Sequence, residues 1–304
     1  MNSSRLTIVC RPAIPGDTPD VLELTKTIWE GHDYVPEVWE EWLSDTQGQL
    51  LVAEFDGKVL GISKLSRLSP EDWWMQGLRV HPQYEGQGIA SQLTDATVQA
   101  WVETGSGTVR LGTASFRLPV QHMCNRLGFE KVSELAPFYA PASQSDDPSP
   151  VFEPLAIHQV EEAVGFAIRS QSLALTAGLI DLGWHYARSR IEFMAAAVER
   201  NLAWWWRGRE GLLTARLDED DELGVAPSIE LLACPLDALP QILLDYRSLA
   251  GGLGFSQAAW MAPLTDSLAQ VLETAGYKRV WENSLYLYSK IHPVKPSTDP
   301  VAKL

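Results

Sequence analysis

The chain has 304 residues, of which 45% are hydrophobic and 21% charged, as in an ordinary globular protein. At about 150 residues to a domain, this length predicts two domains. The net charge of −15 is shared by both halves: residues 1–148 carry 11 Lys/Arg against 20 Asp/Glu (−9), and the remainder 13 against 19 (−6). Because neutralising phosphates requires a basic face, this charge excludes a general nucleic-acid binder.

The three cysteines, Cys10, Cys124 and Cys234, are odd in number and far apart, which argues against a disulfide framework and for a reducing compartment. The N-terminal residues lack a hydrophobic signal region, and no stretch approaches the ~18 apolar residues of a membrane-spanning helix. We therefore expect a cytoplasmic protein without a membrane partner.

Hydrophobic periodicity and turn residues predict the order β-α-α-β-β-β-α-β-α-β for the first 140 residues. The predicted elements are a strand over 5–13, a helix over 22–29 capped by Asp20, a helix over 35–43, a hairpin turning at Asp56-Gly57, a strand over 72–80, a helix over 93–101, a strand over 108–114, a helix ending at Gly128 and a strand over 131–140.

Residues 141–150, "PASQSDDPSP", are rich in Pro, Ser and Asp and predict a linker. Residues 151–292 repeat the element order in outline, and "LETAGYKRV" echoes "CNRLGFEKV", so that Gly276 corresponds to Gly128. We expect Trp204-Trp205-Trp206 to alternate between the faces of a strand as core and inter-domain packing. The predicted organisation is a domain over 1–140, the linker, a second domain over 151–292 and a flexible tail over 293–304.

The most informative stretch is "HPQYEGQGIASQL", residues 81–93. A glycine-rich turn between a strand and a helix aims several backbone N–H groups at one point, and the glycines let an anionic group approach. A tight turn without a ligand is the alternative. The loop follows a hairpin meander and lacks a Gly-Lys-Ser/Thr ending, so neither a dinucleotide-binding nor a nucleotide-triphosphate loop fits.

With these motifs, the chain resembles the GNAT superfamily of acyl-CoA-dependent N-acyltransferases over residues 5–140, most closely in "LRVHPQYEGQGIASQL" and "NRLGFEKV". The resemblance implies an α/β (α+β) fold of two tandem GNAT-like domains, the second degenerate, each with a mixed, mostly antiparallel sheet flanked by helices. It also implies that acetyl-CoA is the co-substrate, with no metal. The second half has no glycine pair after Cys234.

The family's Gln/Arg-x-x-Gly-x-Gly/Ala signature falls on Glu85-Gly86-Gln87-Gly88-Ile89-Ala90, whose amides would hold the diphosphate of acetyl-CoA. The full set of cofactor-binding residues implied is Leu78, Arg79, Val80, Glu85, Gly86, Gln87, Gly88, Ile89, Ala90, Ser91 and Arg117. Glu85 departs from the signature. A solvent-facing carboxylate near a phosphate costs about 0.5–1 kcal/mol at water-like dielectric, so we expect weakened but retained binding.

The catalytic candidates are also departures from the family pattern. Where relatives have a Tyr that protonates the leaving thiolate, this chain has Cys124; the alternative role for that thiol is packing, and Tyr139 is a substitute donor. Gln76 stands where a Glu base is usual, and an amide positions substrate but takes no proton. Proton removal then falls to water, Asp33, His32 or Glu54. His81 and His122 are expected to be structural and exposed, respectively.

Residues 29–43 lie where the family has its substrate-side helices, and together with "GLRVHP" they look similar to the histidine N-acetyltransferase-like branch. Asp33, Tyr34 and Gln76 are therefore candidate substrate-binding residues, against the alternative of a helix–helix turn with Tyr34 packed. The predicted function is N-acetylation of a small-molecule amine or amino acid by a monomer or homodimer. The competing hypothesis is a non-catalytic tandem GNAT module that senses acyl-CoA or a metabolite.

Overall fold

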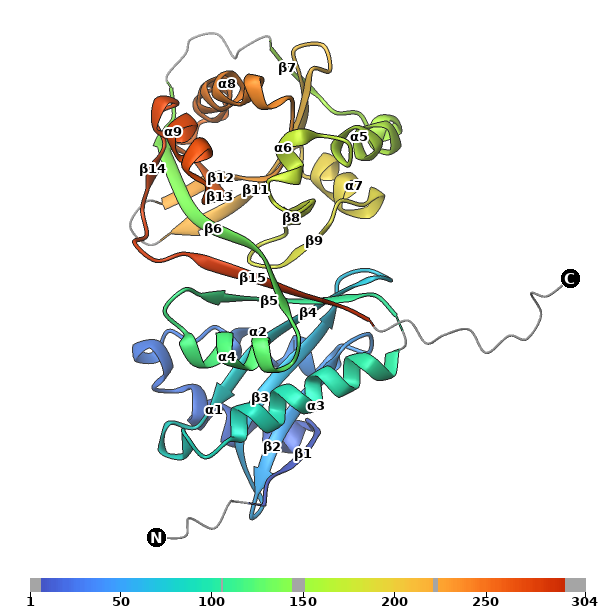
Figure 1. Cartoon of the computed structure of the whole chain (residues 1–304), viewed down its shortest axis with the longest axis vertical. Helices are drawn as coiled ribbons and strands as arrows, with labels where there is room; N and C mark the ends of the chain where they lie inside the picture. Colours follow the sequence, from blue (N-terminus) through green and yellow to red (C-terminus); the bar gives the residue numbers. More distant parts are fainter. Residues whose placement is uncertain (1–6, 105, 144–150, 221–223, 293–304) are drawn as a thin grey trace, which may run out of the picture. The chain divides into compact units, whose positions relative to one another are not determined.

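A computed structural model of the chain describes residues 7–104, 106–143, 151–220 and 224–292, and the described residues divide into two compact units (Figure 1). Unit 1 comprises the described residues up to Leu111, Pro119–Glu130 and those from Ser289 on. Unit 2 comprises Gly112–Leu118 and Lys131–Tyr288. Most of the predicted linker (144–150) and the predicted tail (293–304) lie outside the described residues.

The two units are not continuous segments of the sequence. The strand after Glu130, which the sequence places in a first domain of residues 1–140, has its contacts in unit 2. The last described strand, which the sequence places in the second domain, contributes its final residues to unit 1. Unit 1 is therefore completed by residues from the far end of the chain.

Unit 1 has the predicted order of helices and strands, with short 3-10 turns between them. Its elements are β1 (Val9–Pro12), η1 (Pro15–Asp17), α1 (Thr18–Thr25), η2 (Ile28–Gly31), α2 (Val35–Ser44), β2 (Gln49–Phe55), β3 (Lys58–Arg67), β4 (Asp72–Val80), η3 (Pro82–Tyr84), α3 (Ile89–Thr104), β5 (Thr108–Ala114) and α4 (Leu118–Arg126), the last two running partly into unit 2. The first helix begins earlier than predicted, so Asp20 lies inside it and accepts a hydrogen bond from the Val59 amide (2.9 Å) instead of capping it.

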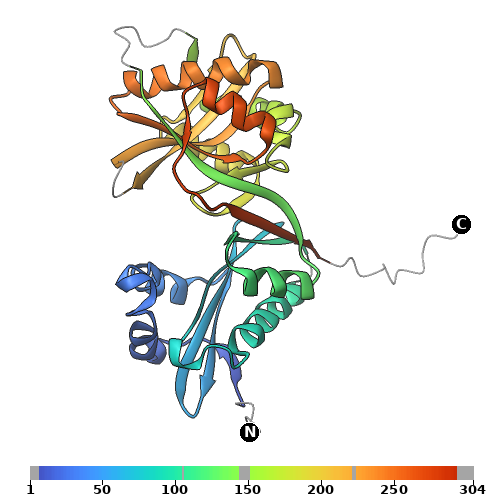
Figure 2. The same ribbon diagram turned by 60° about the vertical axis from the view of Figure 1, so that its left-hand side comes forward.

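The sheet of unit 1 has the order β1-β2-β3-β4-β5, antiparallel except for the parallel pair β4–β5. Alternate residues of β2 and β3 face opposite sides, as strand geometry requires. One side packs Val52 and Ile62 under α1 and α2, and the other packs Leu51 under α3 (Figure 2). The sheet is thus covered on both faces, and the β4–α3 turn lies at its end.

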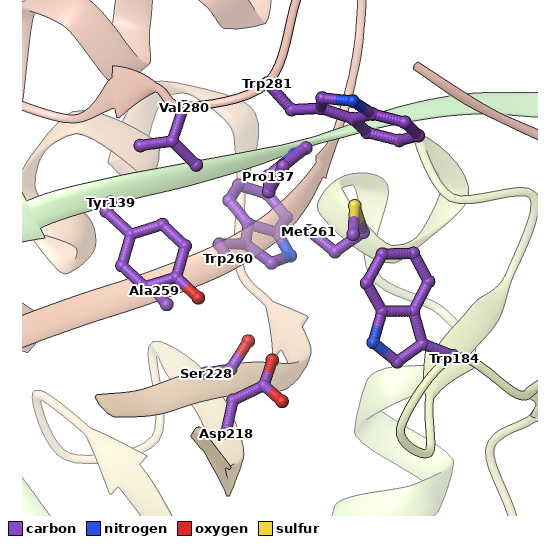
Figure 3. Close-up of a pocket in the computed structure, with 10 residues that line it drawn as sticks. All are labelled: Pro137, Tyr139, Trp184, Asp218, Ser228, Ala259, Trp260, Met261, Val280 and Trp281. Atoms are coloured by element: carbon purple, nitrogen blue, oxygen red, sulfur yellow. The ribbon is translucent and has the colours of Figure 1, made fainter. Parts of the chain in front are cut away.

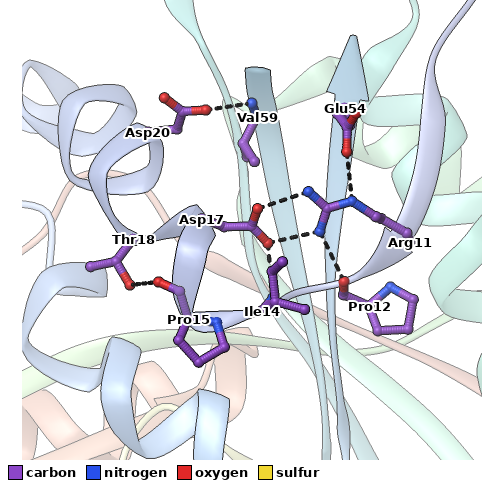
Figure 4. A network of polar contacts seen from close by, with 9 residues as sticks. All are labelled: Arg11, Pro12, Ile14, Pro15, Asp17, Thr18, Asp20, Glu54 and Val59. Atoms are coloured by element: carbon purple, nitrogen blue, oxygen red, sulfur yellow. Dashed lines mark hydrogen bonds and ion pairs between the residues drawn. The ribbon is translucent and has the colours of Figure 1, made fainter. Parts of the chain in front are cut away.

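An ion-pair network fixes the first strand to the start of α1 (Figure 4). Arg11 donates to both carboxylate oxygens of Asp17 (2.8 Å each) and to Glu54 of β2 (2.6 Å). The bidentate geometry favours a well-ordered pair. Glu54, a base candidate from the sequence, is therefore engaged in holding β1 and β2 together.

Unit 2 repeats the arrangement of unit 1. Its elements are β6 (Glu130–Pro141), β7 (Phe152–Pro154), η4 (Ile157–Gln159), α5 (Val160–Ala167), α6 (Gln171–Ala174), β8 (Leu179–Asp181), β9 (Tyr186–Arg188), α7 (Ile191–Glu199), β10 (Ala203–Trp206), β11 (Gly211–Asp220), β12 (Gly224–Ala233), η5 (Leu236–Ala238), α8 (Leu239–Gly252), β13 (Gln257–Pro263), α9 (Asp266–Thr274), β14 (Lys278–Arg279) and β15 (Leu285–Ile291). The strand order β7-β10-β11-β12-β13-β6 is antiparallel except for the pair β12–β13, which matches β4–β5.

Two predictions about the repeat are confirmed in the described residues. Gly128 and Gly276 both have left-handed backbones (φ 72° and 84°), and in each case the amide of the next residue bonds the carbonyl five positions back. Trp204 and Trp206 pack in one core cluster and Trp205 in another, so the three rings alternate between the faces of β10. All three are buried.

The three cysteines are free thiols, and Cys124 and Cys234 are buried. Among the helices of the described residues, none combines the length and apolarity needed to cross a bilayer.

Candidate functional site

The glycine loop places several backbone amides at the start of α3 in unit 1. His81 and Pro82 begin η3, and Gly86 and Gly88 follow with left-handed backbones (φ 75° and 84°). Within the described residues, the amides of Gly86, Gln87 and Gly88 have no hydrogen-bond acceptor. The first amides of α3, at Ile89, Ala90 and Ser91, are those that a helix leaves unpaired.

The conformation of the loop requires its glycines. A side chain at Gly86 would point into open space, so the left-handed backbone, not a steric contact, selects glycine there. The half-exposed Gly88 caps the helix, its carbonyl accepting from Gln92 N–H (3.1 Å). Free amides together with the positive end of a 16-residue helix make this turn a site for an anionic group.

Strand β4 offers a second set of backbone groups beside the loop. It is bulged at Gly77 (φ 66°), where its register with β3 shifts. Its pairing with β5 covers Asp72–Trp74. From Met75 to Val80 the strand is hydrogen-bonded to β3 on one side, and within the described residues its β5 side is left open. This open edge contains Leu78, Arg79 and Val80, the residues predicted to pair with the pantetheine arm.

Arg126, which the sequence analysis did not single out, holds the start of α3. Its guanidinium donates to Ser91 Oγ (2.9 Å) and pairs with Asp95 (2.6 Å). The Arg126 side chain is 46% exposed, so the pair itself contributes little to stability. The pairing places the guanidinium of Arg126 beside the hydroxyl of Ser91, in the first turn of α3 after the glycine loop.

Glu85 is exposed and has an extended backbone (φ −60°, ψ 153°). Its carboxylate can therefore remain in water. The effect of Glu85 on anion binding at the loop stays a prediction.

Arg79 lies at the centre of an aromatic cluster in unit 1. Its Nε and Nη2 donate to the two carboxylate oxygens of Asp33 (2.9 and 3.0 Å). The guanidinium carbon lies 4.3 Å from the ring centre of Trp29 and 5.3 Å from that of Tyr34. Burial raises the pKa of the Tyr34 hydroxyl, so Tyr34 is a neutral hydrogen-bonding group at physiological pH.

Asp33 is sealed inside this cluster, with a side chain only 1% exposed. Besides binding Arg79, it accepts a hydrogen bond from the amide of Val35, the first residue of α2 (3.2 Å). The structure brings Asp33, Tyr34 and Arg79 together, but Asp33 faces Arg79 and not solvent. Of the three, Arg79 and Tyr34 are the ones with bonding capacity left for a ligand.

The segment before Asp33 has an unusual backbone. Trp29, Glu30 and Gly31 all have left-handed conformations (φ 48°, 59° and 93°), and the Trp29 ring is 48% exposed. Left-handed backbone at non-glycine residues is costly and gathers at ligand-binding sites. The exposed Trp29 ring, stacked on Arg79, was not identified from the sequence. Three consecutive left-handed residues leave no clear sequence signal apart from Gly31.

Gln76 lies on β4 opposite Lys64 of β3, and its amide nitrogen donates to Ser66 Oγ (2.9 Å). Lys64 is buried, with 1% of its side chain exposed, and its ammonium pairs with Asp45. Neither group is a free base. Gln76 therefore has the geometry of a positioning residue, because its hydrogen bond to the hydroxyl of Ser66 fixes its side-chain amide.

Cys124 is buried in α4 with 2% exposure. Burial raises the pKa of its thiol to about 12, so the thiol is protonated but is a weak acid at neutral pH. Its surroundings are those of a packing residue.

Two predicted residues lie in the unit that does not contain the loop. Tyr139 is on β6, paired with Ala259, and lines a pocket of unit 2. Arg117 is exposed and lies 5.7 Å from the ring centre of Phe116. The described contacts therefore assemble the loop, β4 and the Arg79 cluster in unit 1 and assign Tyr139 and Arg117 to unit 2.

The histidine candidates have ordinary roles. His81 accepts from the amide of Gln83 (3.2 Å) and caps η3, and His122 is exposed, both as expected. His32 is exposed and contacts the Trp29 carbonyl (3.1 Å). Within the described residues, no cluster of three or more His, Cys, Asp or Glu side chains is placed to hold a metal ion.

Comparison with known proteins identifies the fold. Residues 18–129 match the acetyltransferase (GNAT) family. A putative acetyltransferase from Thermoplasma acidophilum superposes with a TM-score of 0.60 at 19% identity, covering 93% of this chain and 99% of the other. A tandem GNAT protein from the clavulanic acid biosynthesis pathway superposes with a TM-score of 0.53 at 9% identity, covering 95% and 99%. At these identities the structural likeness establishes the fold alone.

Curated relatives match over a shorter stretch. A histidine N-acetyltransferase of Oreochromis niloticus is 32% identical over 78 residues, which is 25% of this chain and 23% of the relative. The corresponding enzyme of Scomber australasicus is 31% identical over 78 residues, with the same coverage. The match thus spans about a quarter of the length of these relatives.

Proposed function

We propose that this chain is an acetyl-CoA-dependent N-acetyltransferase acting on a small-molecule amine or amino acid, because residues 18–129 match the acetyltransferase (GNAT) family and the fold resembles that of a tandem GNAT protein. The observation that carries the proposal is the β4–α3 turn. Its unpaired amides at Gly86, Gln87 and Gly88 adjoin the open edge of β4, so one site offers donors to a diphosphate and a strand edge to an amide-containing arm.

The remaining cofactor contacts follow from the same arrangement. The first-turn amides of α3 and the cation of Arg126 add positive potential beside the loop. Leu78 to Val80 supply backbone groups for the pantetheine amides. Arg117, from unit 2, remains a proposed contact that a binding measurement must test.

For the acceptor, we place an amino acid at the Arg79 cluster. A guanidinium has five N–H donors; Asp33 and the Leu78 carbonyl engage three of them, and Arg79 also hydrogen-bonds the Tyr34 hydroxyl. The remaining donor and the hydroxyl hydrogen of Tyr34 suit a carboxylate. The name of the matched Oreochromis niloticus protein, a histidine N-acetyltransferase, supports an amino acid as substrate. Asp33 then acts as a positioning residue that orients Arg79.

In the reaction, the lone pair of the neutral amine attacks the thioester carbonyl, the C–N bond forms, the C–S bond breaks and the amine proton is lost. Gln76 positions the acceptor, and water takes its proton, since Asp33 and Glu54 are engaged in ion pairs. The thiolate of coenzyme A receives a proton from Tyr139 or from solvent. Cys124, a weak acid in a buried position, serves packing.

The test is acetylation of histidine against histamine, which differ only in the carboxylate. Release of free coenzyme A and the acetylated product are measured with the full chain and acetyl-CoA. We expect histidine to be acetylated faster, and Arg79→Gln to raise KM for histidine while leaving histamine nearly unchanged. Equal rates for both acceptors contradict the carboxylate site. Lack of turnover across amino acids and amines contradicts the enzyme.

A sensor of acyl-CoA is the second candidate, favoured by Gln76 in place of a carboxylate and by the buried Cys124. It predicts stoichiometric acetyl-CoA binding in calorimetry, abolished in Gly88→Val, without release of coenzyme A from any acceptor. The two measurements together therefore distinguish an enzyme, a sensor and a chain that binds no acetyl-CoA.

A further inference from the structure

Unit 2 contains a pocket of about 280 Å³ with several aromatic residues in its walls (Figure 3). It is formed by strands β6, β11, β12 and β13 together with two loops. Its lining residues are Pro137, Tyr139, Trp184, Asp218, Ser228, Ala259, Trp260, Met261, Val280 and Trp281. Apart from Tyr139, a candidate proton donor, the acetyl-transfer proposal gives the residues of this pocket no role.

The lining of the pocket combines aromatic rings with a carboxylate. The indole rings of Trp184 and Trp281 and the phenol of Tyr139 border the space, while Asp218 and Ser228 approach it from another side (Figure 3). No lysine or arginine is among the lining residues. Tryptophan faces attract cations more strongly than other aromatic faces do, because of the negative potential of the ring.

Trp184 is held at the pocket by a turn with a strained backbone. Its backbone is left-handed (φ 61°), a costly conformation for a bulky residue, and its ring is 51% exposed. Asp181 stabilises this turn by accepting from the amides of Gly183 (2.9 Å) and Trp184 (3.1 Å). The fold thus holds a large apolar ring half in solvent, where its own burial contributes little.

The charged side chain in the lining is the carboxylate of Asp218, whereas the nearby Arg279 is bound to the carbonyl of Trp281 (2.7 Å). Asp218 pairs with Arg216 (2.9 Å), which also pairs with Asp181 (3.3 Å), so one cation is shared by two carboxylates. The neighbouring Glu230 has its own partner in Arg200 (2.7 Å). One negative charge is therefore left over in the Asp181–Arg216–Asp218 group, and Asp218 brings it to the pocket.

We propose that this pocket binds a small organic cation, an alkylated or quaternary ammonium group, between Trp184, Trp281 and Tyr139 with Asp218 as the counter-charge. The volume suits a small head group, and the aromatic walls suit a weakly hydrated cation whose substituents are apolar. A neutral apolar ligand would gain nothing from Asp218, and an anion would be repelled by it.

The test uses choline and its neutral isostere 3,3-dimethylbutan-1-ol, in which a carbon replaces the charged nitrogen. Binding to the full chain without acetyl-CoA is measured by calorimetry and by tryptophan fluorescence. We expect choline to bind about tenfold more tightly than the isostere. Equal affinities, or tighter binding of the isostere, overturn the proposal in favour of a merely apolar pocket.

Choline binding by variants of the pocket residues tests whether choline binds in this pocket. We expect Trp184→Ala and Trp281→Ala to weaken choline binding at least fivefold and Trp184→Phe, which keeps an aromatic face, to weaken it less. The matched control is Phe116→Ala, an exposed aromatic residue of unit 2 outside the pocket, which should retain wild-type affinity. Far-ultraviolet circular dichroism checks that each variant is folded. Wild-type affinity in folded Trp184→Ala and Trp281→Ala, or an equal loss in Phe116→Ala, overturns the proposal.

Discussion

The two units turn from strand to helix in related but different ways. Both turns begin with a residue followed by proline, His81-Pro82 and Cys234-Pro235, and both contain a 3-10 turn. In unit 1, Glu85–Gly88 follow before α3 begins at Ile89. In unit 2, α8 begins directly at Leu239.

The difference decides which turn offers donors to a ligand. The amides of Gly86 to Gly88 are unpaired within the described residues, whereas Pro240 removes an amide from the first turn of α8. The unit 2 turn is also tied down, because Cys234 N–H donates to Ser172 Oγ (2.8 Å) and its carbonyl accepts from Ser170 (3.1 Å). The two turns thus share a 3-10 segment, and the additional glycine-containing residues of unit 1 are what make its turn a candidate ligand site. The turn of unit 2 only connects a strand to a helix.

The strands before these turns differ in charge. From this difference we expect the largest effect, a change in the free energy of unfolding with pH. β12 carries the buried Glu230, where β4 carries the amide of Gln76 and no carboxylate near its middle. Burial raises the pKa of Glu230 to about 7. Its usual pKa is ~4.3, so the folded chain binds this proton more tightly, and the stabilisation present at low pH is lost as pH rises through 7.

Between pH 5 and pH 8 we expect this group to lower the free energy of unfolding by about 2 kcal/mol. Urea unfolding of the full chain at the two pH values measures the change, and Glu230→Gln should remove that part of it. Glu219→Gln, at an exposed position of β11, is the control and should behave as wild type. The same pH slope in Glu230→Gln and wild type contradicts the prediction.

Breaking the unit 1 turn tests the comparison directly. Gly88→Val places a β-branched side chain at a left-handed backbone position (φ 84°) and in the path of the anion. We expect the dissociation constant of acetyl-CoA to rise about tenfold or more, measured by calorimetry. Gly254→Val imposes the same strain (φ 89°) in open space in unit 2 and should leave binding unchanged. An equal loss in both variants would mean that strain, not the site, governs binding.

Cys124→Ala tests the proton donor. If the thiol packs, the free energy of unfolding falls by about 1–2 kcal/mol through a small cavity, and kcat is retained. Cys124→Ser, similar in volume, should also retain kcat. A ~10²-fold fall in kcat with unchanged KM would instead make the thiol the acid of the reaction. Tyr139→Phe, assayed in parallel, then distinguishes Tyr139 from solvent.

The smallest expected effect is at Glu85. Replacing this exposed carboxylate by a cation, Glu85→Arg, should tighten acetyl-CoA binding several-fold, since each charge near a phosphate counts for about 0.5–1 kcal/mol at water-like dielectric. The gain should shrink as salt is added, because exposed charges are screened. Glu85→Gln should lie between the two. Weaker binding by Glu85→Arg would assign Glu85 a role in the loop itself.

Local features of the fold were predictable because single residues determine them. Asp56-Gly57 forms the predicted hairpin turn with two left-handed residues (φ 50° and 75°), and Gly86 and Gly88 have the left-handed backbone that their spacing indicates. The order of elements followed from periodicity. The family signature located the glycine loop, whereas the cofactor residues inferred from it stay predictions.

The rest depends on contacts between distant residues, which periodicity does not encode. The pairing of Asp33 with Arg79 joins residues 46 positions apart, and no local pattern indicates it. Asp20 was predicted as a cap because nothing local shows that Val59 will need an acceptor. The left-handed Trp29 and the raised pKa of Glu230 likewise depend on tertiary packing.

The division of the chain between the units has a consequence for how the protein is made. The residues that finish unit 1 are among the last described: Lys290 donates to the carbonyl of Leu127, and His292 bonds Gly107 (2.9 Å) and packs on Trp101. During synthesis, these contacts of unit 1 can form only after all of unit 2 has left the ribosome. The unit that carries the glycine loop should gain its full protease resistance only when these residues are present, which limited proteolysis of released chains truncated after Tyr288 and after His292 would reveal.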